Sequence, residues 1–337
     1  MGLFNKFTDT VILKNDCELE LQIDALKKLL KKYPNNEKLK HKLKICELGL
    51  IGENEIKFEL ENSNIGMYVL RDINLKYGEM SAQIDYIIVT SGYFYFVECK
   101  NLIGNILVND RGEFIREYNY NNRKIKEGVY SPIRQAERHI DIFTKMLDER
   151  RSNSLLYKLR REFCEEAYKS WYKPLVVFAN SKNILNVKYA PKEIKEKIVK
   201  SDSLVEYIKR DIQKIDKDLL SNQERMYKNA INIMENYNEK IDRDYEKEFL
   251  KLVEEEASND KTTNNDEKLK EELILFRKNR AKEKNIPPYY VFNNDELNEL
   301  IKNKPKTIEE LRSLKILVDI KVISHGKEIV KIIQKNS

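Results

Sequence analysis

The chain has 337 residues, a formal net charge of +6 and a charged fraction of 35%. This length exceeds one typical domain and indicates two or three. The composition excludes a chain that is disordered throughout. Its four cysteines are scattered without a C-x-x-C pair and its three histidines are dispersed, which excludes a zinc finger, a disulfide framework and a histidine metal cluster.

No apolar run of about 20 residues occurs, so we expect no membrane span. No secretory signal is recognisable and the cysteines are expected to stay reduced, so we expect a cytoplasmic protein. The positive net charge is compatible with a nucleic-acid partner but does not require one. Scarce glycine and proline predict long helices and few irregular loops.

Residues 1–50 predict an N-terminal helical hairpin. Apolar residues recur at helical spacing from position 19, the pattern is interrupted at Pro34, and a second helix follows over 38–48. The many lysines of this hairpin are more often its solvated side than a nucleic-acid face. Residues 1–7 are expected to begin as a helix that packs its apolar side chains on the protein. The hairpin is predicted to cover the next domain, or a homodimer is expected to form through it or through the long helices further along the chain.

Residues 51–190 predict an α/β domain. A helix is expected over 52–60, and two strands are expected over 83–90 and 93–101. The near-continuous apolar runs of these strands indicate that both faces of their hairpin are covered. The later elements are a hairpin over 107–120 with its turn at Asn109–Gly112, a third β element over 121–126, a helix from Pro132 to about 147, a helical region over 155–172 and a buried strand over 174–180.

The remaining chain predicts more helix and a second domain. Residues 191–257 are expected to form a helical extension that includes a long helix from 222 to about 255. A polar linker is expected over 258–266, because this segment has no apolar anchors. Residues 267–337 predict an all-α bundle. There, 16 Lys and Arg residues exceed 11 Asp and Glu residues by five, which is nearly the whole net charge of the chain.

Two carboxylates and a lysine meet at one end of the predicted central hairpin. Asp85 stands near the start of the first strand, and Glu98 and Lys100 stand near the end of the second, where the strand period of two aims both at one face. A turn-capping aspartate and a surface ion pair would explain these residues singly. Burying all three charges is costly, however, and a divalent cation such as Mg²⁺ would offset the cost.

The order of an aspartate, a spacer and Glu-x-Lys resembles the core of the PD-(D/E)xK nucleases. With its flanking strings, the chain resembles NERD, the nuclease-related domain, over about residues 52–147. The resemblance implies a restriction-endonuclease-like α/β core with a mixed central sheet flanked by helices, and the predicted α-β-β-β-α-β order agrees with it. The strings that carry the resemblance are Gly52–Leu60, Val69–Ile73, Gln83–Asp85, Tyr95–Lys100, Asn101–Ile106 and Ser131–Gln135.

This resemblance implies a metal-dependent active site. Asp85 and Glu98 would ligate Mg²⁺ or Mn²⁺, with the main-chain carbonyl of Cys99 as a further ligand. The Cys99 side chain is expected to point to the opposite face and to pack there. Lys100 would hold the attacking water or stabilise the charge that develops at phosphorus.

The resemblance also implies two supporting residues on helices. Glu53, expected in the first turn of its helix, would orient the metal, and Gln135 would orient the metal-bound water or contact a phosphate. Each has a simpler explanation. An acidic residue is favoured in a first helical turn by the helix dipole. A glutamine in a first turn can simply be solvated.

The C-terminal segment resembles the HRDC domain of RecQ-type helicases and ribonuclease D over about residues 268–336. The resemblance implies a helical domain that aids nucleic-acid binding, with a protein–protein module as the alternative. Residues 314–319 replace the family's usual glycine-containing turn, so phosphate contact through this turn is not implied. The strings that carry the resemblance are Leu273–Phe292, with its Pro287-Pro288-Tyr289 element, Asn293–Leu297, and Lys321–Val330.

The leading hypothesis is therefore a Mg²⁺-dependent nuclease that hydrolyses phosphodiester bonds of nucleic acid, of DNA rather than RNA. A non-catalytic nucleic-acid-binding or scaffolding protein and an RNA nuclease are the alternatives. No G-x-x-x-x-G-K-[ST] loop is present, so ATP-driven translocation is not expected.

Overall fold

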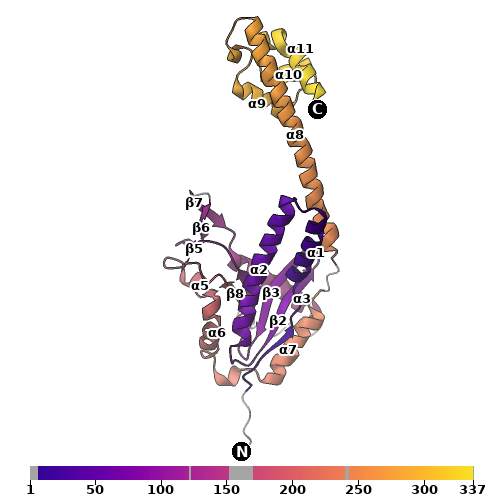
Figure 1. Cartoon of the computed structure of the whole chain (residues 1–337). Coiled ribbons are helices and arrows are strands. Elements are labelled where there is room, and N and C mark those ends of the chain that lie inside the picture. The colour runs from indigo at the N-terminus through magenta and orange to yellow at the C-terminus, as the bar shows by residue number, and fades with distance from the viewer. Residues whose placement is uncertain (1–6, 121–122, 152–169, 240–242, 337) are drawn as a thin grey trace, which may run out of the picture. The chain divides into compact units, whose positions relative to one another are not determined.

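The computed structural model describes residues 7–120, 123–151, 170–239 and 243–336. The chain divides into two compact units, Met1–Glu248 and Phe249–Ser337 (Figure 1). The first unit is a mixed α/β structure and the second is helical. The predicted fold class is thus confirmed.

The first unit is built on a mixed six-stranded sheet in the order β1-β2-β3-β4-β8-β10. The predicted hairpin lies at its centre, where β3 and β4 pair antiparallel with Ile87 opposite Phe96. Strand β4 also pairs parallel with β8, so the carboxyl ends of these two strands meet at one edge of the sheet. The strands are β1 (Thr10–Lys14), β2 (Met67–Tyr77), β3 (Met80–Val89), β4 (Phe94–Lys100), β8 (Tyr172–Phe178) and β10 (Ile198–Lys200).

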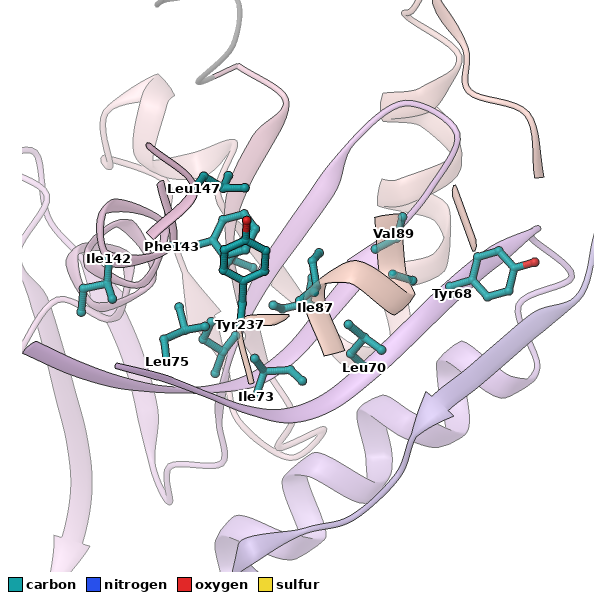
Figure 2. Packing of buried hydrophobic residues seen from close by; sticks show 14 of the residues in the cluster. Tyr68, Leu70, Ile73, Leu75, Ile87, Val89, Ile142, Phe143, Leu147 and Tyr237 are labelled. Atoms are coloured by element: carbon teal, nitrogen blue, oxygen red, sulfur yellow. The ribbon is translucent and has the colours of Figure 1, made fainter. Parts of the chain in front are cut away.

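Helices cover both faces of this sheet, which explains the near-continuous apolar runs of β3 and β4. On one face, Ile87 and Phe96 pack with Phe143 of α3 and Tyr237 after α7, as the close view in Figure 2 shows for three of them. On the other face, the strands pack against α2 and α6. Among the described residues, the helices that lie wholly within this unit are α1 (Glu18–Lys32), α2 (Glu37–Glu61), α3 (Pro132–Arg151), α5 (Lys192–Lys195), α6 (Leu204–Ile212) and α7 (Gln223–Asn236), with 3₁₀ turns at Ser201–Ser203 and Lys217–Leu219.

A second, four-stranded sheet in the order β7-β6-β5-β9 lies beside the first. Its β5–β6 turn is the predicted one: the Asn109 side chain accepts from the N–H groups of Arg111 and Glu113, and Gly112 takes a φ of +76°, which glycine tolerates. Phe114 packs on Phe178 of β8 and joins the two sheets in one core. The strands are β5 (Asn105–Val108), β6 (Phe114–Tyr120), β7 (Arg123–Val129) and β9 (Leu185–Asn186).

The N-terminal region differs from the prediction, because it is not a separate hairpin. Strand β1 precedes α1, pairs parallel with β2 and forms one edge of the main sheet. Helix α2 then runs unbroken from Glu37 to Glu61, so the two helices predicted over 38–48 and 52–60 are one. Figure 1 shows α1 and α2 side by side against the sheet. Phe7 stacks on Tyr68, while residues 1–6 lie outside the described residues.

The helical extension also differs from the prediction. The helix expected over 222–255 ends at Asn236, because the following residues pair with β2: the Glu239 N–H donates to the Asn74 carbonyl, and the Asn74 N–H donates to the Asn238 side chain. The linker expected over 258–266 is instead part of one continuous helix, α8 (Tyr245–Glu283). That segment has no glycine or proline to break a helix. The helical region expected over 155–172 lies largely outside the described residues.

The second unit is a small helical bundle around one apolar core, which contains Leu273, Phe292 and Ile329. An Asn293–Glu296 capping box begins its helix α9. In the described part of the chain, no helix has the length and apolar character that crossing a membrane requires. After α8, the elements are the 3₁₀ turn Pro288–Tyr290 and the helices α9 (Asn294–Asn303), α10 (Ile308–Ser313) and α11 (Asp319–Lys335).

Candidate active site

The end of the central hairpin brings Asp85 and Glu98 together. The last ladder pair of β3 and β4 is Tyr86 opposite Val97, so Asp85 and Glu98 are the next residues in register. The main-chain pairing of β3 and β4 has ended there. Instead, the Asp85 carboxylate accepts a hydrogen bond of 2.6 Å from the main-chain N–H of Cys99. The side chain of Cys99 packs on the other face of the sheet, as predicted.

Lys100 completes the predicted trio. Its Nζ donates to Oε1 of Glu98 at 2.5 Å and to Oε1 of Gln135 at 3.2 Å. Gln135 lies in the first turn of α3, the helix that covers this face of the sheet. The structure therefore brings together five of the six predicted site residues, Asp85, Glu98, Cys99, Lys100 and Gln135. The Lys100 ammonium group is held between the carboxylate of Glu98 on β4 and the side-chain amide of Gln135 on α3.

The cation in contact with this pair, Lys100, does not fully offset the burial of the Asp85 and Glu98 carboxylates. Glu98 is only 3% exposed, and this burial raises its pKa although Lys100 acts in the opposite direction. Burial, with the nearby charge of Glu98, raises the pKa of Asp85 to about 8. The second carboxylate oxygen of Glu98, Oε2, is buried and has no hydrogen-bond partner. Such a pair gains stability from an added cation.

The donor set fits a hard divalent metal ion. Asp85 and Glu98 offer carboxylate oxygens, and the Cys99 carbonyl faces the β3 side of its strand, because the N–H and C=O of one strand residue point the same way. Within the described residues, no three His, Cys, Asp or Glu side chains gather closely enough to form a metal site by themselves. The main-chain carbonyl and water would therefore have to complete the coordination.

The Glu53 carboxylate makes no hydrogen bond with this cluster. It is in the middle of α2, so the predicted first-turn position is wrong, because α2 begins at Glu37. Its carboxylate accepts two hydrogen bonds from the Arg71 guanidinium, at 2.9 and 3.1 Å. Burial and then the charge of Asp85 raise the pKa of Glu53 to about 7, against the opposing effect of Arg71. The charge of Asp85 thus acts on Glu53 and the charge of Glu53 acts on Glu98, while the Glu53 carboxylate is hydrogen-bonded by Arg71 on β2 and by the Cys17 thiol.

Sequence reasoning gave no role to His139, which the structure places against Glu98. The His139 Nδ1 lies 3.9 Å from the free Oε2 of Glu98, and neither buried atom has a hydrogen-bond partner. Burial, and then the charge of Arg138, lowers the pKa of His139 to about 4, so the ring is neutral near pH 7. The available signal was spacing: His139 follows Gln135 by four residues and shares its helix face.

Asp72 is a second residue that the sequence did not single out. It is buried in β2 with a φ of +56°, which a non-glycine residue rarely adopts. Its carboxylate accepts from the Gln83 side chain and from the Glu18 N–H, while Lys14 Nζ donates to its carbonyl at 2.8 Å. These contacts fix the irregular point of β2 beside the end of β3. No local pattern in the sequence reports such an arrangement.

The fold and the cluster define an α/β core with a carboxylate–lysine site, followed by a helical unit. Comparison with protein families identifies both parts. Residues 48–179 match NERD, the nuclease-related domain, and residues 266–333 match the HRDC domain. The chain thus contains a nuclease-related domain and an HRDC domain, as the sequence strings predicted. Searches of curated proteins and of solved structures find no match.

Proposed function

We propose that this protein is a metal-dependent nuclease that hydrolyses phosphodiester bonds, with DNA as the preferred substrate. The observation that carries the proposal is the burial of the Glu98 carboxylate with one oxygen left without a hydrogen-bond partner. This carboxylate is buried beside Asp85, one oxygen is held by Lys100, and the other has no partner. A buried oxygen without a hydrogen-bond partner costs free energy of folding, and a cation bound at this site would be coordinated by that oxygen.

Asp85, Glu98 and the Cys99 carbonyl would hold the ion, Mg²⁺ or Mn²⁺. When bound, such an ion polarises a phosphoryl oxygen and lowers the pKa of a water. Lys100, fixed by Glu98 and Gln135, would donate its one remaining N–H to the attacking water or to a phosphate oxygen. Because strand β4 and helix α3 both hold this lysine, little reorganisation is needed at the moment of reaction.

Glu53 and Gln135 act as positioning residues in this proposal. Gln135 accepts from Lys100 and so restricts the direction of the ammonium group. Glu53 anchors α2 to β2 through Arg71 and adds negative charge near Asp85. The HRDC domain supplies nucleic-acid affinity, since the last 71 residues carry five of the six net positive charges.

The test is a cleavage assay on labelled single- and double-stranded DNA and RNA, with Mg²⁺, with Mn²⁺ and with a chelator. We expect metal-dependent cleavage of DNA that Asp85→Asn and Glu98→Gln abolish. Both substitutions keep side-chain size and remove charge, so a circular-dichroism melt should show a folded protein. A matched control is Glu79→Gln, an exposed carboxylate in the turn between β2 and β3. Cleavage that persists in both site variants would refute the assignment.

The same assay separates the alternatives. Cleavage confined to RNA would identify an RNA nuclease. Binding without cleavage of any substrate would favour a non-catalytic nucleic-acid-binding or scaffolding protein.

A further inference from the structure

We propose that a cavity between the small sheet and the first turn of α3 holds the nucleic-acid strand next to the cleaved phosphate. The inference rests on the proposed nuclease function and specifies its substrate: a single strand, whose unpaired base stacks on Tyr130 while Arg111 and Arg134 hold its phosphates. The cavity has a volume of about 670 Å³, and these three residues belong to its lining.

The charges of the cavity favour a polyanion. Of its two acidic residues, Glu137 is balanced by an ion pair with Lys197 at 2.5 Å, whereas Glu113 accepts from the Asn109 side chain at 2.7 Å and keeps its charge, so the two arginines outnumber the one unbalanced carboxylate. The side chains of Arg111 and Arg134 are exposed and make no ion pair or hydrogen bond with the residues that the structure describes. Two guanidinium groups therefore remain available, and guanidinium matches phosphate geometry.

Helix α3 connects this cavity to the active site. Arg134 precedes Gln135, whose side chain contacts Lys100. Arg138 follows Arg134 by one helical turn on the same exposed stripe, and its charge lies near enough to Glu98 to lower the pKa of that carboxyl. A strand lying along this stripe would present successive phosphates to Arg134, to Arg138 and then to the Glu98–Lys100 pair.

Tyr130 indicates that this strand is unpaired. It lies between β7 and α3, two residues before Pro132, is 62% exposed, and makes no ring contact within the described residues. An exposed aromatic ring beside free arginines is the combination that binds single strands, because any unpaired base can stack on the ring. A base inside a duplex is already stacked and offers no face to it. The cavity thus selects single-stranded segments or frayed ends.

The experiment measures binding by the full-length protein in a chelator, so that no cleavage occurs. The probes are oligothymidylate and oligouridylate of about 20 nucleotides, which exceed one typical site, and a duplex of the same length. We expect Tyr130→Ala to weaken single-strand binding by about tenfold and to leave duplex binding unchanged. Arg111→Ala and Arg134→Ala should each lower the log–log salt slope by about 0.7 on single strands. Tyr33→Ala and Arg225→Ala, exposed residues elsewhere on this unit, are the matched controls.

A second measurement locates the strand directly. Photo-crosslinking of an oligonucleotide that carries 5-iodouridine should label the peptide containing Tyr130. If Tyr130→Ala loses equal affinity for the deoxy and the ribo oligonucleotide, the cavity binds single strands irrespective of their sugar. If it loses affinity for one of them alone, the cavity is specific for DNA or for RNA accordingly. Unchanged affinity in Tyr130→Ala, with crosslinks only outside residues 111–138, would overturn the inference.

Failure of this inference and failure of the proposed function give different results. If Glu98→Gln abolishes metal-dependent cleavage but Tyr130→Ala binds as the unchanged protein does, the nuclease function is supported and the single-strand site is refuted. If Tyr130 is crosslinked but no metal supports cleavage, the single-strand site is supported and the nuclease function is refuted.

Discussion

Lys100 shows how one residue's contacts define its role. Its ammonium group is bound by Glu98 and Gln135, so it lies beside the proposed metal ligands without being one of them. We predict that Lys100→Met reduces turnover by about 10²–10³-fold, the range seen when one transition-state donor is lost. Metal affinity should be retained, because both carboxylates remain.

Calorimetric titration with Mn²⁺ checks this prediction. Glu98→Gln is the comparison variant, since it removes a proposed ligand. If Lys100→Met lost as much Mn²⁺ affinity as Glu98→Gln, the lysine would have to be reassigned to the metal-binding set.

His325 links pH to the stability of the helical unit. It is buried on α11 beside Phe276, and its Nδ1 has no hydrogen-bond partner. Burial, and then the charges of Lys284 and Arg280, lowers its pKa, while Glu328 acts in the opposite direction. The unfolded chain therefore binds a proton more readily than the folded unit does. Stability is complete above the unfolded pKa of about 6.5 and decreases as the pH falls towards the folded pKa.

The measurement is urea unfolding of the full chain at several pH values from about 7.5 down to 5, in the range where an ordinary histidine titrates. We expect the transition of the helical unit to weaken on acidification, and to lose much of that pH dependence in His325→Phe, which keeps a ring and removes the titrating group. A histidine resonance that titrates above 6.5 for His325 would contradict the prediction.

At the scale of elements, the approach of α2 to the end of β4 depends on Gly52. A Cβ at this position would lie 2.6 Å from the Cβ of Asn101 and 3.3 Å from the Cβ of Ala179. These are short, backbone-anchored side chains, so the helix itself would have to move. We predict that Gly52→Ala destabilises the protein by about 1–3 kcal/mol and lowers activity, because Glu53 and the end of β4 shift together.

Gly49, one turn earlier on the same helix, is the control. Its Cβ would meet only the terminal methyl groups of Leu19, which can rotate away. Alanine should therefore be neutral there, or stabilising by up to about 1 kcal/mol through its higher helix propensity. Thermal melts of both variants check the contrast. Equal stabilities would show that α2 is free to adjust at the site.

Elements whose signal is local were predictable from the sequence. The β3–β4 hairpin, the Asn109–Gly112 turn and the start of α3 at Pro132 each depend on neighbouring residues alone, and the structure contains them. Because strand period fixes the face of a side chain, the convergence of Glu98 and Lys100 was predictable as well.

Features that depend on distant partners were not predictable. The end of α7 is set by pairing with Asn74, more than 160 residues earlier in the chain. Glu53 was placed in a first turn because a helix start and a mid-helix position look alike without knowledge of what precedes them. Its partner Arg71 lies on another strand. His139 and Asp72 gain their significance from burial, which a single local pattern does not report.

At the scale of the whole molecule, the candidate catalytic residues and most of the net positive charge lie in different units. The nuclease-related domain holds Asp85, Glu98 and Lys100, whereas five of the six net positive charges fall within Glu267–Ser337. Each unit has its own apolar core, so each can fold around its own contacts.

We therefore predict that a chain ending at Asp266 remains folded and cleaves, but binds nucleic acid more weakly than the full chain. Losing phosphate contacts of the HRDC domain should flatten the salt dependence of binding by about 0.9 in log–log slope per contact on duplex DNA. The truncation keeps Tyr245 and Phe249, the buried residues of the first turns of α8. Salt titrations of DNA affinity for both chains, in a chelator, give the comparison. If slopes and affinities were identical, the HRDC domain would not touch the nucleic acid, and its basic surface would have to serve a protein partner.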